Sequence, residues 1–165
     1  MDINRSIISQ YKAALTIVLD CIEKCPEGLW FDKSKGFPIW HLCYHGLFFT
    51  DLYLHKGKKD FSPWEKSRKN YERFESDPFD QSISIRIEQP YSRDEMREYC
   101  KYLYDKIDKK VPELDMKSPS GFEWLPFSRL ETHLYNLRHL EHHAGQMVDR
   151  LRNHGKVEVK WVTSG

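Results

Sequence analysis

The sequence predicts an all-α fold, a bundle of four helices that forms one domain over residues 1–165. Apolar residues recur three or four positions apart in four stretches, two of these begin with capping signals, and no internal repeat or linker divides the chain. A chain of 165 residues is long enough for a single sizeable core. The alternative is an α+β domain built around the alternating segments 82–87 and 156–162.

The first helix is predicted over residues 2–25. Its apolar residues share one face, and Pro26 and Gly28 follow its end. These residues are Ile3, Ile7, Tyr11, Ala14, Leu15, Val18 and Ile22. The second helix is predicted over residues 38–56, with Pro38 in its first turn and Gly57 just past its end. So many of its side chains are bulky and apolar that we expect it to be largely buried.

Residues 57–91 form a long and irregular link. Ser62-Pro63 and Asp77-Pro78 mark turns, residues 64–74 predict a short helix, and residues 82–87 alternate like a strand. Long connections inside a compact domain often cover a functional site. The aromatic and arginine side chains of the link are candidates for a pocket wall, although the run KSRKNYER is also typical of a solvated helix face. They are Trp64, Arg68, Tyr71, Arg73, Phe74 and Tyr91.

The third and fourth helices each begin with a capping-box pattern, a serine followed three residues later by a glutamate. The two pairs are Ser92 with Glu95 and Ser128 with Glu131. Pro112 limits the third helix, and Gly155 ends the fourth after residues 153–154. We expect residues 156–162 to lie as an extended tail against the bundle.

The composition argues against several classes of function. The formal net charge is +1, which gives no support for binding to nucleic acid or to a membrane surface. No apolar run approaches the ~18 residues that a membrane span needs, and the N-terminal residues do not resemble a secretory signal. The four cysteines form no CxxC pair, so we expect reduced, buried thiols and a cytoplasmic protein.

The segment RHLEHHAGQM in the fourth helix contains three histidines that are not equivalent. His139 and His143 are four residues apart and therefore project from the same side of the helix, where two imidazoles can reach one metal ion. His142 points about 100° away from His143. The zincin motif HExxH is absent, because Glu141 lies on the opposite side from the pair.

A third ligand is available from the second helix. His45 lies in the middle of its bulky arc, and burial of an unpaired histidine costs about 1–3 kcal/mol, so it needs a polar partner. A metal ion shared with His139 and His143 would satisfy it, but a histidine hydrogen-bonded within the core is the alternative. His41 is a candidate fourth ligand, which would close the site. Gln146 and Arg150 could support the ligands or face a substrate.

The stretches PIWHLCYHGLFFTDLYL and NLRHLEHHAGQMVDRLR resemble the DinB-like metalloenzyme superfamily, which includes bacillithiol transferases and mycothiol-dependent maleylpyruvate isomerase. The resemblance implies a four-helix bundle of up-down-down-up order, with a long crossover between the second and third helices. It also implies a divalent metal ion held by His45, His139 and His143. The ligand type and the resemblance together favour zinc or nickel.

Function follows from the resemblance and from the ligand chemistry. Three neutral imidazoles leave the metal its full charge and an open position, which suits activation of a thiol or of water. We therefore expect a metal-dependent thiol S-transferase that joins a small thiol to a small electrophile. The alternatives are a metal-dependent hydrolase and a non-catalytic metal-binding or stress-response protein. A homodimer is a further expectation.

Overall fold

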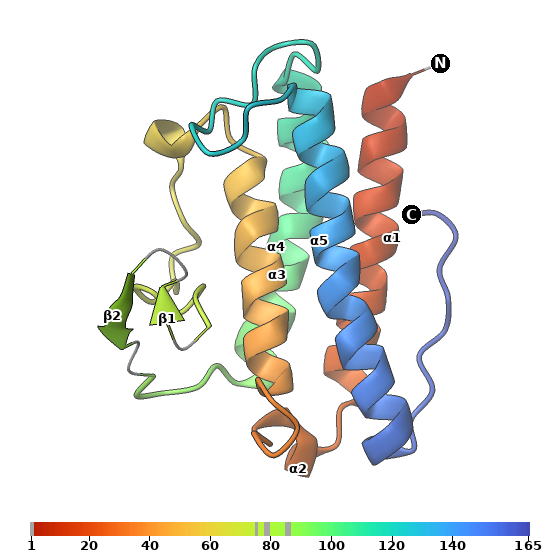
Figure 1. Cartoon of the computed structure of the whole chain (residues 1–165). Helices are drawn as coiled ribbons and strands as arrows, with labels where there is room; N and C mark the ends of the chain where they lie inside the picture. The colour runs from red at the N-terminus through yellow and green to blue at the C-terminus, as the bar shows by residue number, and fades with distance from the viewer. Residues whose placement is uncertain (1, 75, 78–79, 85–86) are drawn as a thin grey trace.

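Four long helices form the main body of the protein. The computed structural model describes residues 2–74, 76–77, 80–84 and 87–165. In Figure 1 the long helices lie side by side, and both α1 and α3 pack against α4 and against α5. They are α1 (Ile3–Lys24), α3 (Ile39–Tyr53), α4 (Arg93–Lys110) and α5 (Arg129–Arg150). The prediction of an all-α fold class is confirmed, with the short helix α2 (Glu27–Trp30) between α1 and α3.

The link between α3 and α4 carries a small hairpin beside the helices (Figure 1). Strands β1 (Ser76–Asp77) and β2 (Asp80–Ser84) run antiparallel, with Ser76 opposite Ser84. The strand predicted over residues 82–87 is therefore present in part, residues 85–86 lie outside the described residues, and residue 87 is not in a strand. The tail over residues 156–162 forms no strand, so the α+β alternative does not apply.

One predicted helix is absent, and one predicted helix end is wrong. Residues 64–74 form turns instead of a short helix, and Asn70 adopts a left-handed conformation with φ 67°, which a helix does not accommodate. Helix α3 ends at Tyr53, before the predicted residue 56. The reason is the Arg129 guanidinium, which donates to the backbone carbonyls of His55 at 2.8 Å and of Lys56 at 2.7 Å. These contacts hold the chain in a turn.

The serine caps predicted at Ser92 and Ser128 are present, and Asp2, which was not predicted as a cap, also caps a helix. Asp2 accepts a hydrogen bond from the Arg5 amide at the start of α1. Helix α4 begins with the full capping box, and Ser128 accepts from the Glu131 amide at the start of α5. Helices α4 and α5 end close to the predicted Pro112 and Gly155. A short helical turn follows each of them, at Val111–Glu113 and at Leu151–Gly155.

The core between the long helices is rich in aromatic side chains. The largest fully buried ones are Trp30, Trp40, Tyr11, Tyr44, Tyr91 and Tyr99. All four cysteines are buried and free, as predicted. The tail packs back onto the bundle, where Val159 is buried and the Gly165 amide donates to the Ser9 carbonyl in α1. Among the described helices, none combines the length and the apolar character that a membrane crossing requires.

The core also contains a buried polar network between α1 and α5. The hydroxyl of Tyr11 lies 3.0 Å from Nδ1 of His133 and accepts a hydrogen bond from the Asn136 amide at 3.0 Å. All three side chains are fully buried. Burial lowers the pKa of His133 to about 4, so this histidine is neutral at neutral pH.

Candidate metal centre

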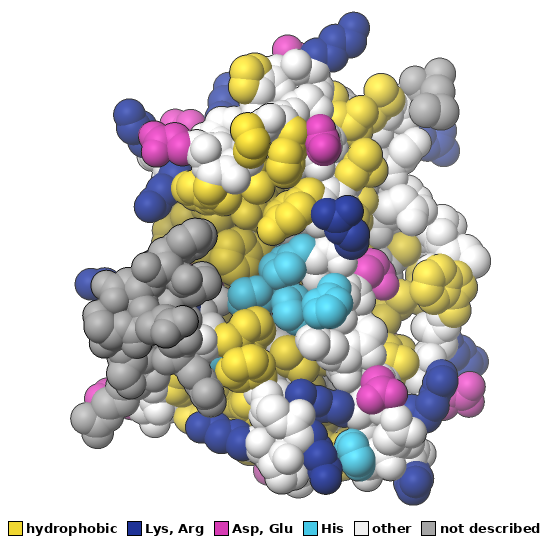
Figure 2. Space-filling view, in the orientation of Figure 1, with side chains coloured by type: hydrophobic (Ala, Val, Ile, Leu, Met, Phe, Trp, Pro, Cys, Tyr) yellow, Lys and Arg dark blue, Asp and Glu magenta, His cyan; other side chains and the backbone are white. Residues whose placement is uncertain are grey.

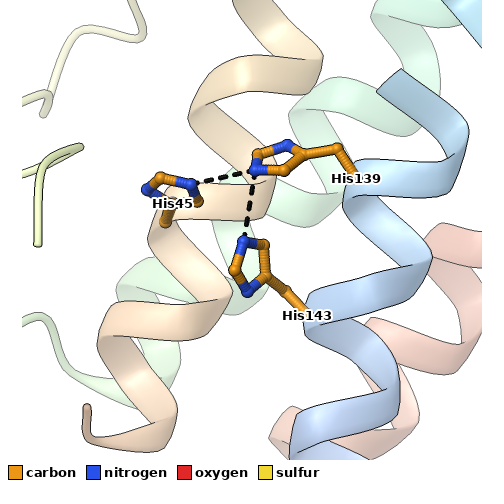
Figure 3. A group of neighbouring side chains, drawn as sticks. All are labelled: His45, His139 and His143. Atoms are coloured by element: carbon orange, nitrogen blue, oxygen red, sulfur yellow. Dashed lines mark hydrogen bonds between the residues drawn. The ribbon is translucent and has the colours of Figure 1, made fainter. Parts of the chain in front are cut away.

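Three histidines from two helices meet at the surface between α3 and α5. His45 comes from α3, while His139 and His143 lie one turn apart on α5 (Figure 3). Nε2 of His139 lies 3.0 Å from Nε2 of His45 and 3.2 Å from Nε2 of His143. The ring nitrogens that can bind a metal all lie within 4.8 Å of one another. The residues predicted from the sequence as a ligand set are thus brought together.

A glycine next to His45 allows the two helices to approach. A Cβ atom at Gly46 would lie 3.1 Å from the Leu140 Cδ1 atom and 3.9 Å from the His143 Cβ atom. A Cβ atom here would therefore require the Leu140 side chain to shift, and a branched side chain would crowd α3 against α5 at the level of the three rings. Gly46 sets the spacing across which His45 reaches the pair on α5.

The outer ring nitrogens of two histidines are held by acceptors. The Nδ1–H of His45 donates to the Glu72 carbonyl at 2.6 Å, and that of His143 donates to the Gln146 Oε1 atom at 2.8 Å. A proton on Nδ1 leaves Nε2 as a lone pair in a neutral imidazole. Metal-bound histidines usually have their second nitrogen held in this way.

The inner nitrogens are left in an unfavourable arrangement without a cation. The Nε2 lone pairs of His45 and His143 both face Nε2 of His139, and a single proton there can serve only one of them. The outer nitrogen of His139, Nδ1, is buried with no hydrogen-bond partner among the described residues, so this ring lacks the acceptor that the other two have. A metal ion between the rings would satisfy all three inner nitrogens, so the group fits a divalent ion.

Burial keeps the group neutral. Desolvation is the largest cause that lowers the pKa of His45 to about 2, and the two neighbouring histidines add to it. Desolvation likewise lowers the pKa of His139 to about 4 and depresses that of His143. The neutral imidazole is the form that binds metal, so the folded protein presents its ligands ready for binding at neutral pH.

The group is reachable from solvent. His45 and His139 are half-buried, and His143 is 6% exposed. In Figure 2 the histidines are visible on the molecular surface, bordered by hydrophobic side chains. His142 is exposed and lies outside the group of three, with its ring centroid 5.1 Å from that of His143.

The other candidate site residues have different surroundings. Nε2 of His41 lies 3.0 Å from the Tyr71 carbonyl and 2.9 Å from the Arg73 carbonyl, so the structure does not bring it into the group of three. Gln146 contacts His143, so it supports one of the ligands, as the sequence allowed. Arg150 donates to the backbone carbonyls of Lys35 and Phe37 before α3.

Of the aromatic residues in the link, Phe74 reaches the candidate site. Its ring stacks on that of His45, with centroids 4.2 Å apart. Arg68 forms an ion pair with Glu95. The other three aromatic residues of the link lie in the core. They are Trp64, Tyr71 and Tyr91.

Sequence reasoning did not single out three contacts of the group. The Glu72 carbonyl leaves no signature in the sequence, because any residue supplies a backbone oxygen. Phe49 and Tyr135 pack on His139, with centroids at 5.3 Å and 6.4 Å. Their positions four residues after His45 and four before His139 are the signal that could have revealed them.

Carboxylates near the metal-binding segments are engaged elsewhere or lie apart. Asp51 is fully buried and accepts from Lys106 Nζ at 2.6 Å and from the Tyr99 hydroxyl at 3.1 Å. Glu141 is half-buried, and desolvation raises its pKa. Neither belongs to the metal-binding group found among the described residues.

Comparison of the chain with protein-family models, with curated proteins and with solved structures gives no match. The resemblance to the DinB-like superfamily therefore stays a prediction. What the protein does has to be inferred from the histidine group and its surroundings.

Proposed function

We propose that this protein binds a divalent metal ion through His45, His139 and His143 and acts as a metal-dependent thiol S-transferase on a small electrophile. The observation that carries the proposal is the set of three converging Nε2 atoms, with the outer nitrogens of His45 and His143 held by acceptors. Zinc or nickel suits an all-imidazole ligand set. The proposal includes the up-down-down-up order of a DinB-like bundle.

When bound, the metal ion would lower the pKa of a thiol so that it is present as thiolate at neutral pH. In the transfer, the sulfur electron pair forms the new S–C bond, the leaving group departs with the electron pair of the bond that breaks, and the thiol proton passes to solvent. The three histidines would hold the metal ion. The Glu72 carbonyl fixes the orientation of the His45 ring, and Gln146 fixes that of the His143 ring.

The thiol has to come from outside the chain. All four cysteines are buried, and desolvation raises their pKa values, to about 12 for Cys21 and Cys100 and about 11 for Cys25. Such thiols are protonated at neutral pH and are poor nucleophiles. A small external thiol is therefore the second substrate.

The two alternatives receive less support. Hydrolysis usually needs a general base near the metal-bound water, and the described metal-binding group contains no carboxylate. A purely structural metal site is usually closed by four protein ligands. Here the group of three lies at the surface, and His41 is engaged with backbone carbonyls.

Metal analysis of the purified protein tests the binding part of the proposal. We expect one divalent ion per chain in the wild type, and a loss of binding in His45→Ala, His139→Ala and His143→Ala. The matched control is His142→Ala, which should keep the ion because His142 lies outside the group. Full metal content in the His45→Ala variant would contradict the proposal.

Turnover tests the transferase part. Metal-loaded protein is incubated with a panel of small thiols and a chromogenic electrophile, and product is followed by absorbance and mass. We expect thiol-dependent product that is lost in His45→Ala and kept in His142→Ala. A rate that His45→Ala leaves untouched would reject a metal-dependent transfer.

A further inference from the structure

A row of aromatic side chains begins at the histidine group, with partly exposed rings at its two ends and buried rings between them. We call it the aromatic face; its members are Phe49, Tyr53, Phe122, Trp124 and Tyr135. Phe49 and Tyr135 are half-buried and form its near end, since both contact the ring of His139. Figure 2 shows hydrophobic side chains gathered on this side of the molecule next to the histidines.

The aromatic face has a buried floor and an exposed far end. Tyr53 lies 6.0 Å from Phe49 and 6.1 Å from Tyr135 between ring centroids, and it is 2% exposed. The floor continues with Phe122, at 5.0 Å from Tyr53 and 3% exposed. Trp124 is 46% exposed, and its indole N–H donates to the Tyr53 hydroxyl at 3.3 Å.

The loop that carries Trp124 is anchored by the backbone. Gly121 adopts φ 82°, and a Cβ atom there would lie 1.8 Å from the Lys56 carbonyl oxygen, so this position requires glycine. Residues 117–123 and 125–128 also line an open hollow of about 580 Å³, which includes Phe122 and Phe127 but not Trp124. The exposed indole is thus presented by a fixed turn.

We infer that the aromatic face binds the body of the electrophilic substrate and that this body is a flat aromatic group. The inference rests on the proposed function, because it assigns the substrate class of the same site. A planar ring placed beside the metal group would contact Phe49 and Tyr135, and a body long enough to extend past Tyr53 would contact Trp124, whose indole N–H donates to the Tyr53 hydroxyl. Aromatic pairs add about 0.5–1.5 kcal/mol each beyond the area they bury, which corresponds to roughly three- to tenfold in affinity.

A series of hydroxamates tests the inference, because the metal-binding head stays constant while the body changes. Acetohydroxamate, benzohydroxamate and a biphenyl hydroxamate are titrated by calorimetry into the metal-loaded full-length protein. We expect acetohydroxamate, which has no ring, to bind most weakly, and each added ring to strengthen binding roughly three- to tenfold. Metal content is measured after each titration to verify that the ion stays on the protein.

Variants separate the two ends of the aromatic face. Tyr135→Ala should weaken both aromatic compounds, whereas Trp124→Ala should weaken the biphenyl compound alone. Acetohydroxamate should bind Trp124→Ala as it binds the wild type, which verifies that the metal group is intact. Because Tyr135 contacts His139, the readout for Tyr135→Ala is the ratio of benzohydroxamate affinity to acetohydroxamate affinity, which should fall. Trp161→Ala is the matched control, because Trp161 is 79% exposed on the C-terminal tail.

The possible failures are distinguishable. If acetohydroxamate binds and the aromatic compounds bind no more tightly, the inference is wrong and the proposed metal centre stands. If no hydroxamate binds metal-loaded protein, the open metal position and the inference both fail. If sedimentation shows a dimer that Trp124→Ala dissociates, the aromatic face contacts a second copy of the chain and the substrate assignment is overturned.

Discussion

The acceptor on the outer nitrogen of a metal-binding histidine controls the ring's tautomer and basicity. Gln146 supplies such an acceptor from a side chain, with its Oε1 atom 2.8 Å from Nδ1 of His143. We predict that Gln146→Leu lowers metal affinity by about 10- to 100-fold, because nothing then fixes the proton on Nδ1. Gln146→Glu should retain most of the affinity, since its carboxylate can still accept.

Affinity is measured by competition with a chromogenic chelator. His142→Ala serves as the control on the same helix, since His142 is exposed and lies outside the group. Equal affinities for Gln146→Leu and wild type would show that the contact does not act on the metal centre.

At the level of single residues, the sequence predicted the ligand set but only part of its support. The spacing of His139 and His143 predicts a same-side pair from helical geometry alone, and a buried histidine in a bulky helix points to a third partner. The contact from Glu72 could not be predicted, because a backbone carbonyl is the same at every residue. Gln146 lies three residues after His143, so helical spacing makes the two neighbours, but the hydrogen bond between them depends on the Gln146 side-chain conformation.

The distance between α3 and α5 is a property of the two elements, and Gly46 limits it. We predict that Gly46→Val lowers metal affinity, because its side chain would meet Leu140 and displace His45 from the pair on α5. Gly145 is the matched control, since it lies on α5 with nothing within 4 Å of an added Cβ atom. Gly145→Val makes the same change in helix propensity without the collision.

Both variants are compared by thermal unfolding and by chelator competition. We expect similar small effects of the two substitutions on helix content and a clear loss of metal affinity in Gly46→Val alone. Equal losses in the two variants would mean that the helix spacing at Gly46 does not position His45.

Element boundaries were predictable where the signal is local. The serine–glutamate patterns at Ser92 and Ser128 predicted the starts of α4 and α5, because each cap and its partner lie three residues apart, although only Ser92 forms the full capping box. The end of α3 was not predictable, because it depends on Arg129, which is remote in sequence and meets the chain only in the fold. The turns over 64–74 were missed for a different reason. The helical pattern there contains no proline or glycine that would mark a turn.

The pH dependence of stability involves the whole molecule, and His133 contributes to it from the core. Its pKa is lowered from 6.5 to about 4, chiefly by burial, so between these values the unfolded chain binds a proton that the folded protein does not. Stability therefore falls as pH drops from about 6.5 to about 4. The contribution of this one group is about 3 kcal/mol at most.

We predict that His133→Gln flattens this part of the stability curve of metal-free protein, because glutamine can still contact the Tyr11 hydroxyl but does not titrate. Urea unfolding is measured between pH 4 and pH 7 for the wild type, for this variant and for His154→Gln, in which an exposed histidine is replaced. Parallel curves for the wild type and His133→Gln would contradict the assignment.

The link between α3 and α4 holds two histidines through its backbone, since the carbonyls of Tyr71 and Arg73 face His41 and that of Glu72 faces His45. Side-chain substitutions at these three positions leave the oxygens in place, so mutational scans will underestimate the importance of the segment. Its length is a different matter. Inserting or deleting one residue here would shift every acceptor at once, so Glu72 and Arg73 should tolerate changes in identity, Tyr71 should not because it is a core residue, and the whole segment should be sensitive to changes in spacing.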